Sequence, residues 1–188
     1  MRLEKAGVRA ALASLVVAPF ILVGAATSAS AATATATLSA GALAFVSAPG
    51  NITFSATLNG TDQTVTSNQG LDVSDGTGSG AGWNITATST TFTSGGHTLS
   101  TSATTVTSTP TVACDASTTC TVATNSISYP YTLPAAVTAP TATKVFNAAA
   151  NTGLGNQTVT VPWKLSVPAG TFAGTYTSTW TISLVSGP

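Results

Sequence analysis

Apolar and polar side chains alternate at every second position along several stretches of the chain, which is the pattern of half-buried β-strands. The segment 51–60 (NITFSATLNG) is the clearest case, because apolar and hydroxyl-bearing residues alternate from Ile52 to Leu58. The Asn59-Gly60 pair that follows is typical of a hairpin turn. We therefore predict a strand here, joined by a tight turn to a second strand that begins in QTVTS.

The alternation returns near the C-terminus in two longer segments, 158–167 (TVTVPWKLSV) and 175–185 (TYTSTWTISLV). Pro162 has no amide hydrogen, so we expect the first of these strands to lie at a sheet edge or to carry a bulge. Between the two segments, Pro168-Ala169-Gly170 has the residue types of a tight turn. This spacing predicts that the last two strands pair with each other as a hairpin.

The pattern as a whole indicates the fold class. Beyond the first thirty or so residues no long segment shows helical periodicity, and Gly, Pro and Asn turns separate many short alternating runs. That combination predicts an all-β protein with an antiparallel β-sandwich, immunoglobulin-like or similar. The length is that of one domain.

The N-terminal segment differs from the rest of the chain. Basic residues precede the apolar run 10–26, and Ala29-Ser30-Ala31 offers the small residues that signal peptidase accepts. We predict a helical signal peptide over 1–31 and a secreted domain over 32–188, with no membrane attachment after cleavage. A retained membrane anchor is the alternative, because the run is nearly long enough to span a bilayer.

Removal of that segment also changes the charge. Residues 32–188 contain two lysines, Lys144 and Lys164, and four aspartates, which gives a net charge of −2. So few cations cannot neutralise a series of phosphates. We therefore expect no binding to nucleic acid, and no electrostatic binding to anionic wall polymers.

The residues needed for catalysis are scarce. Residues 32–188 contain no Glu, and His97 in SGGHTLS is the one histidine. There is no Gly-x-Ser-x-Gly motif, and an aspartate pair such as Asp72 and Asp75 would be the remaining acid–base candidate. We predict that the chain is not an enzyme and uses no cofactor, and that His97 is a solvated loop residue.

A glycine-rich stretch, 74–82 (SDGTGSGAG), leads directly into Trp83. A phosphate-binding glycine loop must open a helix, whereas the WNITAT that follows is a strand pattern. We interpret the stretch as a loop that uses positive φ angles and places Trp83 at the first position of a strand.

The same loop offers oxygen atoms to a cation. Its candidate ligands are Asp72, Asp75, Thr77 and Ser79. Calcium requires six or more oxygens, and no acidic cluster completes such a shell. Local hydrogen bonds from these side chains to the loop backbone are the favoured interpretation, and no metal site is predicted.

The two cysteines, Cys114 and Cys120, lie in CDASTTC. In an exported chain this spacing suits a disulfide that closes a short loop. Zinc would require two more soft or imidazole ligands, which the sequence does not supply. We predict a disulfide between these two residues.

Each tryptophan is followed two residues later by an aliphatic residue, in Trp83-Asn84-Ile85, Trp163-Lys164-Leu165 and Trp180-Thr181-Ile182. Residues two apart in a strand share a face and lie roughly 7 Å from each other. Two interpretations stay open: the indoles fill the core between two sheets, or they form an apolar surface that grips a glycan.

Two motifs resemble the WxL domain, a surface module of Gram-positive bacteria. They are LDVSDGTGSGAGWNITA (71–87) and the terminal YTSTWTISLVSGP (176–188), and the resemblance extends over nearly all of 32–188. Ile85 and Ile182 stand where the family has Leu, a change that keeps volume and polarity. The resemblance implies a β-sandwich that attaches non-covalently to peptidoglycan, often alongside partner surface proteins from the same locus.

We therefore expect a secreted protein of the cell wall surface that binds peptidoglycan without a covalent link, since no sorting signal is seen. One alternative is an assembly subunit that pairs with itself or with partner surface proteins by strand addition. Another is a secreted module for soluble polysaccharides. The candidate wall-binding residues are Trp83, Asn84, Ile85, Trp163, Leu165, Tyr176, Trp180, Thr181 and Ile182.

Overall fold

The computed structural model describes residues 30–188. The predicted signal peptide spans residues 1–31, and its first 29 residues lie outside the described residues. One compact unit extends over Leu38–Pro188. In the described range, no helix is both long and apolar enough to cross a membrane.

The compact unit is built from β-strands, as the alternation predicts. The strands are β1 (Leu43–Phe45), β2 (Gln63–Asp75), β3 (Trp83–Thr90), β4 (Thr93–Ser94), β5 (His97–Thr98), β6 (Thr104–Val106), β7 (Thr111–Cys114), β8 (Tyr131–Thr132), β9 (Ala135–Ala136), β10 (Thr143–Ala148), β11 (Gly155–Val167) and β12 (Trp180–Ser186).

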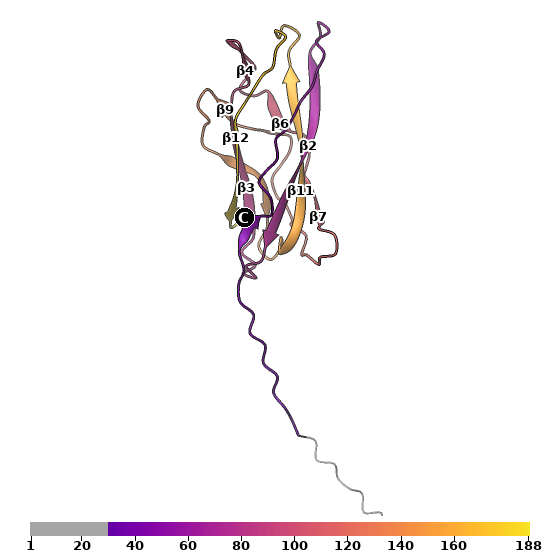
Figure 1. Ribbon diagram of the computed structural model, residues 1–188, viewed down its shortest axis with the longest axis vertical. Coiled ribbons are helices and arrows are strands. Elements are labelled where there is room, and N and C mark those ends of the chain that lie inside the picture. Colours follow the sequence, from indigo (N-terminus) through magenta and orange to yellow (C-terminus); the bar gives the residue numbers. More distant parts are fainter. Residues whose placement is uncertain (1–29) are drawn as a thin grey trace, which may run out of the picture. The chain divides into compact units, whose positions relative to one another are not determined.

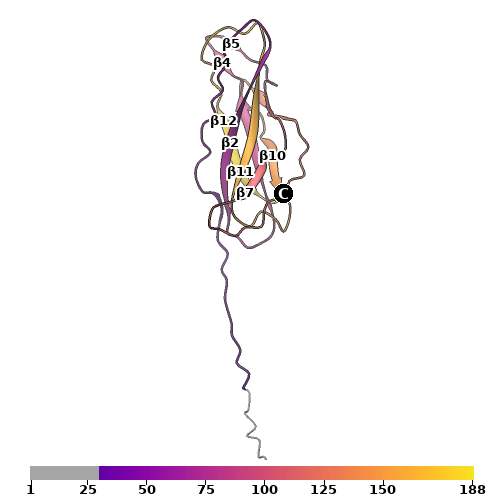
Figure 2. The same ribbon diagram turned by 90° about the vertical axis from the view of Figure 1, so that its right-hand side faces the viewer.

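The strands form two main sheets that lie against each other (Figures 1 and 2). The larger sheet has the order β1-β2-β11-β6-β8, and β7 also pairs with β11. The smaller sheet has the order β10-β3-β12. Pairing is antiparallel except where the short β9 joins β3 in parallel. Strands β4 and β5 form a separate hairpin.

The core lies between the two sheets. Trp83, Ile85 and Phe146 of the smaller sheet and Val161 and Trp163 of the larger sheet have no exposed surface. They belong to a single apolar cluster to which both sheets contribute. The prediction of an all-β antiparallel sandwich is confirmed. In β2 and β11 the two-residue periodicity corresponds to one buried and one more exposed face, whereas β3 is buried on both faces over most of its length.

The prediction for Pro162 is wrong. Strand β11 is a central strand, because it pairs with β2 along its whole length and with β7 and β6 on its other side. Pro162 falls between the residues of β11 that pair with β7, which end at Thr160, and those that pair with β6, which begin at Trp163. A proline is tolerated there because the partner strand changes at that point.

The predicted hairpin between the last two strands is also wrong, although its turn is present. Thr171 donates its amide hydrogen to the carbonyl of Pro168 at 3.0 Å, as expected for a tight turn. Strand β11, however, belongs to the larger sheet and β12 to the smaller one. After the turn the chain crosses from one layer of the sandwich to the other, so the two strands do not pair.

The segment with the clearest alternation is not a strand of either sheet. Residues 47–58, here called the strap, make no backbone-to-backbone hydrogen bond in the described part of the chain. Two glutamines of β2 bond to strap carbonyls instead, Gln69 Nε2 to Gly50 O at 2.7 Å and Gln63 Nε2 to Thr57 O at 2.8 Å. Ile52 and Phe54 pack against the core, so side chains and not a backbone ladder hold the strap.

The glycine-rich stretch does deliver Trp83 to the first position of β3, as predicted. Gly82 has a φ of +74°, and a Cβ at this position would lie 2.4 Å from the carbonyl oxygen of Ala148. Only glycine fits such a close approach of two backbones. The Trp83 indole is thereby placed in the core, where its Nε1 donates to Gly153 O at 3.0 Å.

Two further local predictions are confirmed. Cys114 and Cys120 form a disulfide with a Cα–Cα distance of 5.5 Å. In the glycine-rich loop, Asp75 Oδ1 accepts hydrogen bonds from Thr77 N at 3.0 Å and from Thr77 Oγ1 at 2.7 Å. The loop aspartate thus stabilises its own turn, which is the favoured interpretation from the sequence.

Candidate binding groove

The two motifs singled out in the sequence are neighbours in the smaller sheet. Strands β3 and β12 pair antiparallel, with Trp83 opposite Ser186 and Ser89 opposite Trp180. Beyond the end of β12, Gly187 N donates to Gly82 O at 2.9 Å, and Asn84 Nδ2 donates to Gly187 O at 2.6 Å. The glycine-rich motif and the terminal motif are therefore one structural element.

Several candidate wall-binding residues are part of the core. Trp83, Ile85 and Trp163 have no exposed surface, and Leu165 is 6% exposed. Asn84 is also buried, and its side chain is engaged by the Gly187 carbonyl. Four of these side chains lie in the core away from the surface, and Leu165 lies at its margin with a small exposed part.

The remaining candidates lie where the core reaches the surface. Trp180 is partly exposed, and its ring packs edge-to-face on Trp163, with centroids 4.8 Å apart and an interplanar angle of 77°. A second edge-to-face contact joins Trp180 to Phe92 at 6.5 Å. Because Trp163 is completely buried, it fixes the orientation of the exposed ring.

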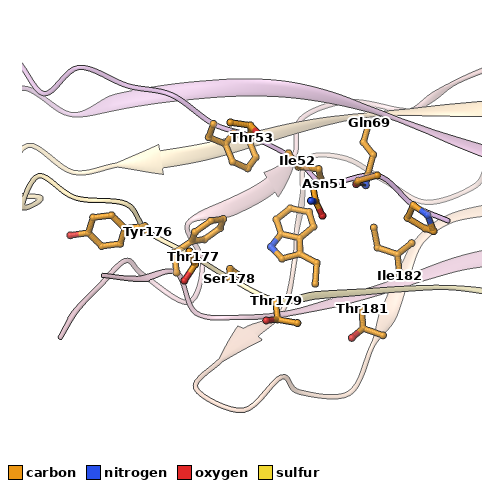
Figure 3. Close-up of a pocket in the computed structure, with 15 residues that line it drawn as sticks. Asn51, Ile52, Thr53, Gln69, Tyr176, Thr177, Ser178, Thr179, Thr181 and Ile182 are labelled. Atoms are coloured by element: carbon orange, nitrogen blue, oxygen red, sulfur yellow. Dashed lines mark hydrogen bonds between the residues drawn. The ribbon is translucent and has the colours of Figure 1, made fainter. Parts of the chain in front are cut away.

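Trp180 lines a half-open groove of about 730 Å³, here called the Trp180 groove. One wall is residues 49–54 of the strap, and the other is the segment 176–182. Gln69 and Phe92 complete the lining. Figure 3 shows Ile182 on the side of its strand that faces Asn51 and Gln69, with Thr179 and Thr181 on the opposite side.

The lining of the Trp180 groove is polar but carries no charged residue. Gln69 accepts a hydrogen bond from Trp163 Nε1 at 3.0 Å and donates one to Gly50 O, so both polar atoms of its amide join the strap to the core. Asn51 is exposed, and Thr and Ser hydroxyls lie along the other wall. Amide, hydroxyl and aromatic groups without charge are suited to neutral sugars.

The family model described as "WxL domain surface cell wall-binding" matches residues 17–188, nearly the whole chain. The chain belongs to the WxL domain family. The resemblance noted in the two sequence motifs is therefore confirmed, and the family is described as a binding domain and not as an enzyme. No curated protein and no solved structure matches the chain significantly.

This WxL domain has a second groove that adjoins the first. It measures about 750 Å³ and is called here the apolar groove. Its walls are residues 52–58 of the strap and residues 171–176, and its floor consists of apolar residues. The floor residues are Val65, Phe92, Leu99, Leu165 and Val167. The residues that line both grooves are Ile52, Thr53, Phe54, Phe92 and Tyr176, of which the terminal sequence motif indicated Tyr176.

An exposed aromatic pair stands beside the apolar groove. The rings of His97 and Phe172 are stacked, with centroids 3.9 Å apart and an interplanar angle of 14°. His97 is exposed, as expected, but it lies in the β4–β5 hairpin and covers one face of Phe172. Phe172 itself is 62% exposed.

Sequence reasoning missed four residues that shape the grooves of the WxL domain: Asn51, Gln69, Phe92 and Phe172. None of them belongs to the two motifs. For Asn51 the alternation in the strap was the available signal, since an inward-facing Ile52 implies an outward-facing neighbour. It did not show that the strap would stand apart from β2.

Proposed function

We propose that this WxL domain is a secreted module that attaches non-covalently to the peptidoglycan of a Gram-positive cell wall, and that the Trp180 groove contacts the glycan. The family description supports a role in wall binding at the cell surface. The groove supports the finer proposal, because it combines an oriented indole with uncharged amides and hydroxyls. Other surface proteins of the same locus are proposed as additional partners.

The proposal that the Trp180 groove contacts glycan depends mainly on the packing of Trp180 on Trp163. A ring that is held by a buried neighbour loses little conformational freedom when a ligand binds, which favours affinity. Its exposed part can cover the C–H face of a sugar, while Asn51 and the hydroxyl of Thr177 satisfy the sugar hydroxyls. The buried candidates Trp83, Ile85, Trp163 and Leu165 then act by shaping the domain.

The proposal makes the domain a binding module without catalytic activity. In the described residues the groove lining holds no Asp, Glu, His or Lys that could transfer a proton. The same composition disfavours anionic wall polymers, since no cation is available in the groove to pair with them.

Sedimentation with purified Gram-positive sacculi tests this function. Asn51→Ala and Tyr176→Ala change exposed or half-exposed groove residues, and each should weaken binding about 3- to 10-fold, as expected for the loss of one or two neutral hydrogen bonds. Asn68→Ala is the matched control, because Asn68 is exposed and lies outside the groove. It should bind like the unmodified chain.

Unchanged binding of both groove variants would remove the Trp180 groove from the wall-binding surface. A glycan array provides the comparison with soluble polysaccharides. If wall fragments score no better than plant or host polysaccharides, the domain is a general glycan-binding module and the wall-specific proposal fails.

A further inference from the structure

The chain contains an unpaired segment with the pattern of a strand. From Ala32 to Ala40 it reads ATATATLSA, in which apolar residues and hydroxyl-bearing residues alternate at every position. This segment, here called the arm, has no helix or strand in the structure and is exposed throughout. Leu38, its one large apolar residue, is 94% exposed.

The apolar groove is bounded by backbone that has no strand partner. Neither the strap nor residues 172–176 on the opposite wall form a backbone-to-backbone hydrogen bond with any residue in the range 30–188. Extended backbone with unpaired N–H and C=O groups is the template for strand addition. The strap wall from Ile52 to Ala56 therefore offers unpaired N–H and C=O groups as ladder partners, with an apolar floor beneath.

We propose that the arm of one copy of this chain binds as an added strand in the apolar groove of a second copy. The arm has nine residues, which span about 30 Å when extended, and the strap wall from Ile52 to Leu58 spans about 23 Å. Neither the arm nor the groove lining carries a charge. The alanines of the arm add little bulk, and Leu38 supplies its one large apolar side chain for the floor of the groove.

The geometry of the chain favours a second copy over the same copy as the source of the arm. Gly41 N donates to Gly76 O at 2.8 Å, and β1 is paired with the end of β2. Residues 41–45 thus run antiparallel to β2, from its last residues toward its start, and lead into the strap. An arm that entered the groove of its own copy would have to reverse direction between Leu38 and Gly41.

The arm and the groove are different surfaces of the same chain. Each copy can therefore give its arm to one neighbour and accept the arm of another, so that copies link head to tail. Linked copies present several Trp180 grooves to the wall, and multivalency raises retention without any new contact to the glycan. The arm contact is tested separately from the wall ligand, because association is measured with the protein alone.

The test is size-exclusion chromatography with light scattering on residues 32–188. The unmodified chain should show a mass of at least twice the monomer at high concentration and dissociate on dilution. Leu38→Asp, in the arm, and Leu58→Asp, in the groove wall, should each remain monomeric. Val137→Asp is the control, because Val137 is 88% exposed and lies outside the groove, and it should associate normally.

Mixing the two variants is the decisive step. The Leu58→Asp copy keeps an intact arm and the Leu38→Asp copy keeps an intact groove, so their mixture should form a species of two copies that neither forms alone. Phe172→Asp replaces Leu58→Asp if the latter does not fold. A monomeric unmodified chain, which an arm folded into its own groove would also give, overturns the proposal. So does a mixture that stays monomeric, or association that persists in Leu38→Asp.

Discussion

Two of the three indole side chains are buried and hydrogen-bonded through Nε1, and the third, Trp180, is partly exposed. Trp83 Nε1 donates to Gly153 O and Trp163 Nε1 donates to Gln69 Oε1, each at 3.0 Å and completely buried. A buried indole N–H without such a partner would cost roughly 1–3 kcal/mol. Trp180 needs no comparable support because it remains partly exposed. The residues that carry the sequence pattern thus divide into two core residues and one groove residue.

At Gly153, any larger residue would clash with the buried Trp83 side chain. Its φ is +80°, and a Cβ would lie 2.5 Å from Trp83 Nε1 and 2.8 Å from Ala148 Cβ. Gly153→Ala should lower the free energy of unfolding by about 2–4 kcal/mol, from backbone strain and overpacking together. Chemical denaturation measures this change. Gly170→Ala is the control, since a Cβ there meets nothing within 4 Å, and an equal loss in both variants would contradict the prediction.

Asp72 gives a pH-dependent prediction. Partial burial, together with the nearby carboxylate of Asp115, raises the pKa of Asp72 above its ordinary value. A raised folded-state pKa means that the contribution of Asp72 to stability is fully present below the unfolded-state pKa and is lost as the pH rises through the folded-state pKa. At neutral pH the charged form is therefore mildly unfavourable.

Asp72→Asn should raise the free energy of unfolding at neutral pH, by no more than about 0.5 kcal/mol because the side chain is partly solvated. The difference from the unmodified chain should disappear near pH 3, where the carboxyl is protonated in both states. Urea denaturation at both pH values measures it. A variant that is less stable at neutral pH would show that Asp72 makes a favourable contact as a carboxylate.

At the scale of elements, the strap is the unusual feature. Its side chains alternate like those of a strand, and Ile52 and Phe54 pack on the core. Its backbone, however, is held by two glutamine side chains and not by a ladder. This arrangement leaves the strap as a wall of both grooves, and it makes the strap a weakly protected element in an otherwise well-paired sandwich.

Hydrogen exchange should reveal the strap directly. Amides of 47–58 should exchange at least about 100-fold faster than those of β11, because amides outside a ladder open without global unfolding. Exchange measured by mass spectrometry distinguishes the two peptides. If association through the arm occurs, strap protection should rise with protein concentration. Protection equal to that of β11 at low concentration would mean that the strap is a paired strand in solution.

At the scale of the whole molecule, the scarcity of charge defines how the domain can bind. Two lysines and four aspartates remain in residues 32–188, and the linings of both grooves are uncharged. Binding must then rest on apolar contact and neutral hydrogen bonds, which salt screens little. This separates the proposed glycan contact from attachment to anionic polymers.

Wall binding should therefore change less than about twofold between about 0.05 M and about 1 M NaCl, where the Debye length falls from above 10 Å to about 3 Å. The sacculus sedimentation assay measures this at each salt concentration. Lys144→Ala should likewise bind normally, since Lys144 lies outside the groove and bonds to Pro188 O at 2.6 Å. A steep loss of binding with salt would indicate an electrostatic ligand and contradict the proposed contact.

The sequence by itself determined the fold class, the disulfide, the loop role of the glycine-rich stretch and the family. These depend on local patterns: two-residue periodicity, cysteine spacing, and residues that permit positive φ angles. Four of the nine candidate residues, Tyr176, Trp180, Thr181 and Ile182, line the Trp180 groove, and their role in wall binding stays a prediction. Local patterns are sufficient for such conclusions because they reflect the backbone of one segment.

The tertiary structure alone decided which strands pair and which indoles reach the surface. Alternation shows that one face of a strand is apolar, but a buried face and a ligand-binding face have the same sequence pattern. Trp163 and Trp180 have equivalent neighbours in sequence, yet β11 is central in its sheet and β12 is an edge strand of the other. The strap shows the same limit, since its inward side chains pack on the core while its backbone stays unpaired. Long-range packing between layers set these outcomes, and no local segment encodes it.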